Sequence, residues 1–224
     1  EGGRGMNRVY WSVAIGLAAL GLGISAWAYS SLPESIPAHW NIHGRVDGHG
    51  SRATVFFMPA VAFGMLLFFA LLPALSPRQF EVDSFRSTYL YLMVVVTGLL
   101  VYLQGVILMA TFREIGGGPR FDLGRALLFG LFVFFGLMGN VMGKVRKNFY
   151  IGIRVPWTLA SDRVWNDTHR LAAWLMVAGA VVGLILVVVG APIIAPFVVL
   201  IGSLLIPVVY SFFHYKALER RGAL

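Results

Sequence analysis

The sequence predicts an all-α polytopic membrane protein with six transmembrane helices, and three observations support this fold class. Hydrophobic residues make up 58% of the 224-residue chain and charged residues only 12%, about half the charged share of a soluble domain. Six apolar segments are each long enough to cross a hydrocarbon core of about 30 Å. Asp, Glu, Lys, Arg and His are absent from the interior of these segments, which disfavours ion-coupled pumps and proton relays.

The six predicted spans cover residues 9–30, 54–75, 87–111, 126–142, 171–190 and 192–213. The last two adjoin at Gly190, Ala191 and Pro192, so we expect a tight antiparallel hairpin of helices. Residues 1–5 (EGGRG) precede Met6, and we expect them to be an added leader outside the fold.

The distribution of basic residues predicts that the N- and C-termini are both cytoplasmic. Lys and Arg concentrate on the cytoplasmic side of membrane proteins. With the N-terminus inside, twelve of them lie in cytoplasmic segments: Arg8, Arg78, Arg86, Lys144, Arg146, Lys147, Arg154, Arg163, Arg170, Lys216, Arg220 and Arg221. Five lie outside: Arg45, Arg52, Arg113, Arg120 and Arg125.

Two long loops divide the chain into halves of three spans each. Residues 6–123 carry an extracellular loop at 31–53, and residues 124–224 carry a cytoplasmic loop at 143–170. Three spans per half would give the halves opposite orientations, which is the geometry of a 3+3 inverted repeat. A Trp-Asn pair occurs in each loop, at Trp40-Asn41 and at Trp165-Asn166.

The outer loop, SLPESIPAHWNIHGRVDGHGSRA, contains the candidate metal ligands His39, His43, His49 and Asp47. Imidazole and carboxylate groups suit zinc or a similar ion, while the lack of cysteine excludes thiolate ligands. Gly44, Gly48 and Gly50 instead indicate successive turns in a solvated loop. That interpretation is preferred over a metal site, and we expect no cofactor and no catalytic residue.

The inner loop is long and has specific helix signals. Val155-Pro156 favours extended backbone, and Ser161 is a good N-cap for a helix that has Asp162 in its first turn. This helix would lead into the fifth span, with Arg163 and Asp167 as an i,i+4 ion pair. We expect Trp157, Trp165 and Trp174 to be interface anchors, and the basic residues to face anionic lipid headgroups.

Polar and small residues within the spans predict helix packing. Gln104 and Asn140 are expected to form hydrogen bonds between helices. Gly179 and Gly183 form a GxxxG pattern that lets backbones approach closely.

The motifs of the inner loop resemble those of a known family. The relevant run is Gly139-Asn140, Gly143-Lys144, Arg146, Asn148, Gly152-Ile153-Arg154, Pro156-Trp157-Thr158-Leu159, Trp165, Thr168 and His169-Arg170. It closely resembles the signature of the SdpI/YfhL family of bacterial membrane immunity proteins. The outer loop, with Leu32-Pro33, Ile36-Pro37, His39-Trp40-Asn41, Gly44 and Asp47, looks like the uncharacterised domain commonly fused ahead of the SdpI core.

The resemblance implies a multi-pass protein of the bacterial cell membrane that protects against a secreted, hydrophobic killing peptide. For the best-known members it also implies toxin-dependent sequestration of a small cytoplasmic repressor at the membrane. The partners implied are membrane lipids, the toxin peptide and the repressor, without direct binding of nucleic acid. The functional surface that we predict comprises His39, Trp40, Asn41, Asp47, Asn140, Lys144, Arg146, Asn148, Arg154, Pro156, Trp157, Thr158, Trp165, Thr168 and Arg170.

Two other functions remain as alternatives. A small transporter or flippase would use a neutral pathway lined by Asn140 and Gln104, and inverted halves would favour it. A metal-dependent membrane enzyme would use His39, His43, His49 and Asp47.

Overall fold

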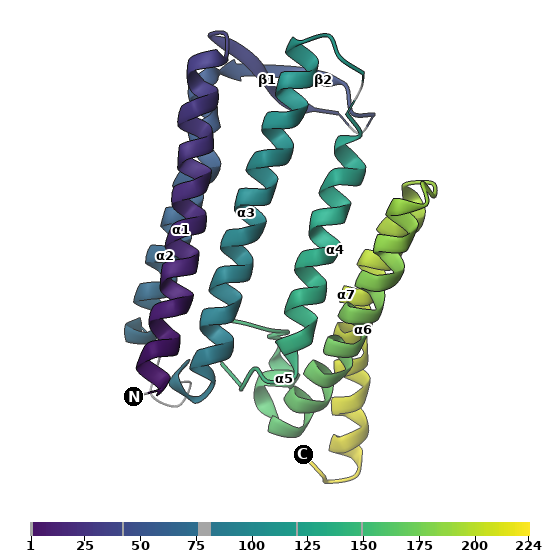
Figure 1. Cartoon of the computed structure of the whole chain (residues 1–224). Coiled ribbons are helices and arrows are strands. Elements are labelled where there is room, and N and C mark those ends of the chain that lie inside the picture. Colours follow the sequence, from purple (N-terminus) through teal and green to yellow (C-terminus); the bar gives the residue numbers. More distant parts are fainter. Residues whose placement is uncertain (1, 42, 76–81, 120, 149) are drawn as a thin grey trace. The chain divides into compact units, whose positions relative to one another are not determined.

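The structure is a computed structural model that describes residues 2–41, 43–75, 82–119, 121–148 and 150–224. Within these ranges, six helical segments are long and apolar enough to span a membrane, at 5–31, 52–75, 86–115, 123–142, 162–188 and 194–220 (Figure 1). The predicted fold class and the number of spans are therefore confirmed. Arg78 and Arg120, which entered the orientation count, lie outside the described residues, and the cytoplasmic position of both termini stays a prediction.

The chain divides into two compact units. The first comprises residues 1–70 and 93–131, and the second comprises 71–92 and 132–224. Three helices contribute to both units: α2 (Phe57–Leu75), α3 (Arg86–Ile115) and α4 (Leu123–Met142). The division of the sequence into halves at 123/124 stays a prediction.

The first unit begins with α1 (Gly2–Ser31), which starts ahead of Met6. The chain then forms a hairpin of β1 (Ser35–Trp40) and β2 (Val46–Ser51) at the end of α1 (Figure 1). The 3-10 helix η1 (Arg52–Phe56) follows and leads into α2, with the Ser51 side chain accepting a hydrogen bond from the Ala53 N–H at its start. The hairpin is thus a short sheet inside an otherwise helical unit.

This hairpin corrects the prediction of a loop made of successive turns. Gly44 does lie in the turn, but Gly48 and Gly50 lie in β2, opposite His39 and Ile36. A Cβ added at Gly48 would come within 3.0 Å of the His39 Cβ. Glycine therefore serves there for close cross-strand approach, a role that the sequence does not distinguish from a turn.

A polar junction and an apolar cluster connect α1, η1 and α3 in the first unit. The Gln104 amide nitrogen donates to the Ser25 hydroxyl at 2.8 Å and to the Val55 carbonyl at 2.9 Å. The Ser25 hydroxyl donates to the same carbonyl at 2.8 Å. Ala28, Leu32, Ile36, Val55 and Leu108 form the buried apolar cluster. The predicted hydrogen bonding of Gln104 across helices is confirmed.

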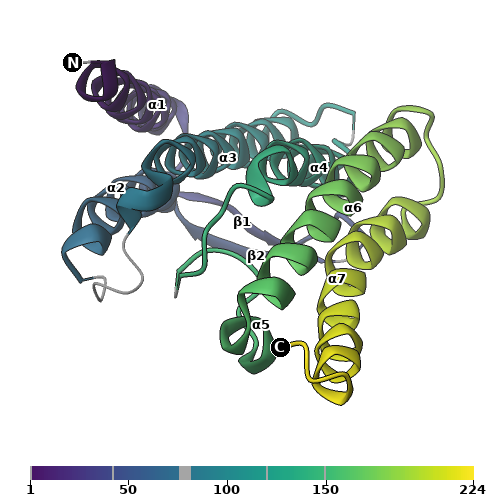
Figure 2. The ribbon, with the colours of Figure 1, turned by 90° about the horizontal axis from the view of Figure 1, so that it is seen from below.

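The second unit adds η3 (Val82–Phe85), α5 (Pro156–Ala160), α6 (Asp162–Val188) and α7 (Ile194–Arg220). Both views show α6 and α7 side by side (Figures 1 and 2). Their connection turns at Gly190, where the Ala191 N–H donates to the Leu186 carbonyl at 3.0 Å. The predicted helix hairpin is confirmed, and α6 is one continuous helix from the inner loop into the fifth span.

The GxxxG pattern has the predicted packing role within this unit. A Cβ added at Gly179 would lie 2.7 Å from the Ser203 Cβ of α7, and one at Gly183 would lie 2.0 Å from the Phe132 ring of α4. Side chains larger than hydrogen would therefore push these helices apart.

Candidate functional site

The candidate site is the segment from Gly143 to Arg170, which follows α4, contains α5 and the first nine residues of α6, and belongs to the second unit. The side chain of Asn148 forms hydrogen bonds with the backbone of the first part of this segment. Its side chain is fully buried, and its amide oxygen accepts from the N–H groups of Tyr150 and Ile151, each at 2.7 Å. Its amide nitrogen donates to the carbonyls of Arg146, at 2.7 Å, and Ile151, at 3.1 Å. Four bonds from one side chain hold the loop backbone in one conformation.

The backbone of Ile153 connects this loop to both following helices. Its N–H donates to Nε2 of His169 on α6 at 3.0 Å. Its carbonyl accepts from the buried hydroxyl of Thr158 on α5 at 2.7 Å. Thr158 also accepts from the N–H of Val155 at 3.1 Å, so the backbone N–H groups of Ile153 and Val155 both have a partner.

His169 is 1% exposed, and its hydrogen bonds define its tautomer. Nδ1 lies 2.7 Å from the Trp165 carbonyl one turn earlier, so Nδ1 carries the proton and donates. Nε2 is then free to accept from Ile153. The ring is neutral in this arrangement, because a proton on Nε2 would remove the acceptor.

Gly152 makes room for His169. Its φ is +111°, a backbone conformation that L-residues with a side chain avoid. A Cβ there would lie 2.3 Å from His169 Nε2. The motif glycine thus permits both the local backbone and the histidine contact.

Trp165 is a core residue rather than the interface anchor that the sequence suggested. It is 1% exposed, its indole N–H donates to the Val145 carbonyl at 2.9 Å, and its ring stacks on His169 with centroids 4.0 Å apart. The prediction failed because the face of α6 that carries Trp165 packs against the loop at Val145 instead of facing outward. Trp174, at 76% exposed, has the exposure expected of an anchor.

Trp157 fixes α5 against α7. Its indole N–H donates to the Ser211 hydroxyl at 2.6 Å, and its ring meets Phe212 edge-on at 5.2 Å. Ser211 is fully buried and donates in turn to the Val208 carbonyl at 2.6 Å. Trp157 therefore has a specific partner in the protein, which a simple lipid anchor would lack.

The start of α6 has the predicted cap, but its acidic side chains have partners that differ from the prediction. The Ser161 hydroxyl accepts from the Val164 N–H at 3.4 Å, as expected of an N-cap. Asp162 pairs with Lys147 at 2.5 Å. The Asp167 carboxylate lies at hydrogen-bond distance, 2.9 Å, from Nε2 of His214 on α7 and does not pair with Arg163. The predicted i,i+4 pair is wrong because α7 offers Asp167 a less exposed partner.

The remaining predicted residues of this segment separate into exposed and buried sets. Lys144, Arg146, Arg154, Pro156 and Arg170 are exposed. Thr168 is fully buried, and its hydroxyl has no hydrogen-bond partner among the described residues. Asn140 is exposed on α4 and forms no hydrogen bond with another described residue, contrary to the expected interhelical bond.

The outer candidates lie on the hairpin of the first unit. Nδ1 of His39 lies 2.5 Å from the Asp47 carboxylate, where a bulge in the strand pairing brings Asp47 toward it. Trp40 ends β1. The Asn41 amide oxygen accepts from the N–H groups of His43, at 2.9 Å, and Arg45, at 3.1 Å, and so closes the turn. In the part of the chain that the structure describes, no three His, Asp or Glu residues gather as a metal site.

Sequence reasoning left out His169, Gly152 and Ser211 as site residues. The signal for the first two was present, because both stand within the run of motifs. Ser211 lies far along the chain in the sixth span, and only the packing of α5 on α7 reveals it. The two Trp-Asn pairs have different local structures, a strand end and a helix interior, so they give the predicted internal symmetry no structural support.

Comparison with known proteins agrees with these motifs. Residues 144–211 match the model of the SdpI/YfhL protein family, and residues 16–63 match a domain of unknown function, DUF1648. The chain is 28% identical over 209 residues to "Immunity protein SdpI" of Bacillus subtilis (strain 168), covering 92% of this chain and 96% of the relative. No solved structure matches it. From Lys144 onward the candidate site therefore lies in the part of this multi-pass cell-membrane protein that is similar to the SdpI/YfhL family, and the part similar to DUF1648 precedes it.

Proposed function

We propose that this chain is a membrane immunity protein that protects a bacterium against a secreted, hydrophobic antimicrobial peptide. The observation that carries the proposal is the similarity to an immunity protein over nearly the full length of both chains. The family domain also coincides with an ordered site: the matched residues 144–211 contain the buried bonds of Asn148, Thr158 and His169. The proposed role is non-enzymatic.

We further propose that the exposed face of the segment 143–170 contacts a cytoplasmic repressor protein. Lys144, Arg146 and Arg170 are exposed on a backbone that buried side chains hold in place. A rigid positive surface favours an acidic partner surface and loses little entropy when it binds. Peptide binding would then change the presentation of this surface, as in two-state coupling between sites.

Gln104 and Asn140 give the transporter alternative no support. Gln104 uses its amide nitrogen in the junction with Ser25 and Val55. Asn140 is exposed on α4.

The test of immunity is survival. The full chain is expressed in a bacterium that is sensitive to a hydrophobic killing peptide. Two quantities are measured: the peptide dose that halves survival, and the membrane potential during exposure to the peptide. We expect this dose to rise and the potential to persist. Unchanged sensitivity at confirmed membrane expression would reject immunity to that peptide.

The repressor proposal needs a separate readout. A fluorescent fusion of a candidate small cytoplasmic repressor is co-expressed, and the fraction of the fusion bound to the membrane is measured with and without peptide. We expect peptide to raise the membrane-bound fraction, and charge reversal of Lys144 and Arg146 to abolish this rise. Recruitment that survives charge reversal would contradict the assignment of this surface.

A further inference from the structure

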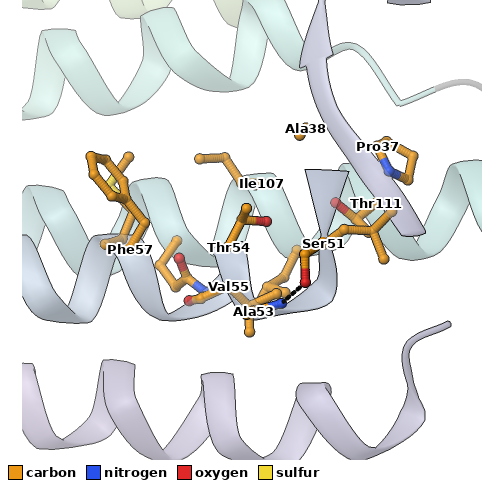
Figure 3. A pocket seen from close by; sticks show the side chains of 13 residues that line it. Pro37, Ala38, Ser51, Ala53, Thr54, Val55, Phe57, Ile107 and Thr111 are labelled. Carbon is orange, nitrogen blue, oxygen red and sulfur yellow. Dashed lines mark hydrogen bonds between the residues drawn. The ribbon is translucent and has the colours of Figure 1, made fainter. Parts of the chain in front are cut away.

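The first unit contains a cavity of about 660 Å³ beneath the hairpin. Figure 3 shows its lining side chains, which come from β1, the end of β2, η1, the start of α2 and α3. Most of the lining is apolar, with Ile36, Pro37, Phe57, Met58 and Ile107 as its larger members. This volume lies within the range of about 300–1,000 Å³ that is typical of ligand-binding pockets.

Two polar side chains in the lining have unused hydrogen-bonding groups. Thr111 is 1% exposed, and its hydroxyl has no partner among the described residues. A threonine in a helix commonly donates to the carbonyl four residues earlier, but this one does not. Gln104 is 3% exposed and uses its amide nitrogen, while its amide oxygen accepts nothing from the described part of the chain.

These two residues belong to one face of α3. Gln104, Ile107, Leu108 and Thr111 follow each other at spacings of three, one and three residues, so they form a stripe about 10 Å long at 1.5 Å per residue. The stripe alternates polar, apolar and polar groups. A ligand that fits it needs hydrophobic surface between polar groups about 10 Å apart.

Arg52, which does not line the cavity, connects elements that surround it. The Arg52 guanidinium lies 4.5 Å from the centre of the Tyr29 ring and donates to the Leu32 carbonyl at 3.3 Å. The Arg52 N–H donates to the Glu34 carbonyl at 2.9 Å. These contacts hold η1 to the end of α1 and to the start of the hairpin.

We infer that this cavity binds an apolar segment of the antimicrobial peptide, with a peptide backbone group paired to the Thr111 hydroxyl. The inference rests on the proposed function, which supplies the peptide. A lipid acyl chain would fill the apolar part but would leave Thr111 and Gln104 unpaired, whereas a peptide carries both N–H and C=O groups. In the predicted orientation the hairpin faces the outside, from which a secreted peptide arrives.

Photo-crosslinking tests the location. A photoreactive residue replaces Thr54, which is exposed in η1 and lines the cavity, in the full chain in native membranes. The matched control carries the same residue at Ala60, which is exposed on α2 outside the lining. The probe is a biotinylated form of the killing peptide used for survival. We expect crosslinking at position 54, competed by unlabelled peptide, and none at position 60.

The chemistry of Thr111 gives a second measurement. Thr111→Val keeps the shape and removes the unpaired hydroxyl, so the thermal midpoint of the purified protein should stay the same or rise. The peptide concentration for half-maximal crosslinking should rise by about five- to tenfold, the equivalent of one lost hydrogen bond. Thr111→Ser, which retains the hydroxyl, should bind nearly as the parent does.

The outcomes separate this inference from the proposed function. Survival conferred by the parent chain, with equal crosslinking at 54 and 60 or a crosslink to phospholipid alone, overturns the cavity assignment and leaves immunity standing. Specific, competed crosslinking at 54 without any survival benefit retains the cavity and rejects immunity. Unchanged half-maximal crosslinking for Thr111→Val contradicts the pairing with Thr111.

Discussion

His169 and Ile153 lie 16 positions apart and are joined by a hydrogen bond of 3.0 Å from the Ile153 N–H to the imidazole Nε2. The bond connects α6 to the loop that precedes α5, inside a unit whose exposed side chains include Lys144, Arg146 and Arg170. A buried side chain thereby sets the conformation of an exposed surface. The functional proposal for this segment depends on that relationship.

His169→Phe should destabilise the protein by about 1–3 kcal/mol. Phenylalanine retains the ring that stacks on Trp165, but the Ile153 N–H loses its partner and stays buried. The measurement is thermal unfolding in detergent, where 1 kcal/mol corresponds to about 2–4 °C for a chain of this size. His49→Phe on the exposed hairpin strand is the control and should be nearly neutral. Equal midpoints for the two variants would show that the histidine bonds contribute no stability.

Gly152→Ala should be much more damaging than Gly190→Ala. Both glycines have positive φ, +111° and +76°, so both alanine variants carry backbone strain of about 1–2 kcal/mol. Only at Gly152 does the added Cβ also meet His169, at 2.3 Å, whereas nothing lies within 4 Å of one at Gly190. Thermal midpoints of the two variants give the comparison. A loss at Gly152 no larger than that at Gly190 would mean that His169 moves aside freely.

Trp157→Phe and Ser211→Ala should weaken the protein through the same bond. Each removes one partner of the indole N–H to hydroxyl contact at 2.6 Å. The double variant should therefore cost clearly less than the sum of the single variants, with a coupling of about 0.5–3 kcal/mol. The unfolding free energies of all four proteins complete the cycle. Additive losses would indicate that Trp157 acts as a lipid anchor after all.

Membrane orientation has a direct test because the chain contains no cysteine. One variant replaces His43, in the loop of the hairpin, with cysteine. A second variant replaces Arg146, in the inner loop, with cysteine. Both positions are exposed. A membrane-impermeant thiol reagent on intact cells should label position 43 at once and position 146 only after permeabilisation. The reverse pattern would invert the predicted topology.

Much of the fold follows from the sequence because membrane spans depend on length and apolarity alone. Six spans, the helix hairpin at Gly190 and the Ser161 cap were all predicted and are confirmed. These features depend on residues that are close in sequence. The hairpin at 35–51 was not predicted, because strand glycines such as Gly48 look like turn glycines until the opposite strand is known.

The interior of the candidate site was less accessible to sequence reasoning. A tryptophan close to a predicted span is typical of an interface anchor, and Trp165 fits that pattern in the sequence. Only its contacts with Val145 and His169 in the structure show that it is buried. Asn148 and Thr158 were predicted as parts of a functional surface, but both are fully buried. Their proposed contribution is therefore to hold the backbone, while the exposed basic residues make contacts.

The most direct test of this account compares Asn148→Asp with Lys147→Gln for survival under the killing peptide at equal membrane levels. Aspartate is nearly the same shape and keeps the two bonds that Asn148 accepts, but it cannot donate to the Arg146 and Ile151 carbonyls. Lys147→Gln removes only the pair with Asp162, whose side chain is 78% exposed; exposed pairs contribute about 0–1 kcal/mol. We predict that Asn148→Asp abolishes most of the protection and that Lys147→Gln retains it. Full protection by Asn148→Asp would contradict the claim that the buried bonds of this loop maintain its functional surface.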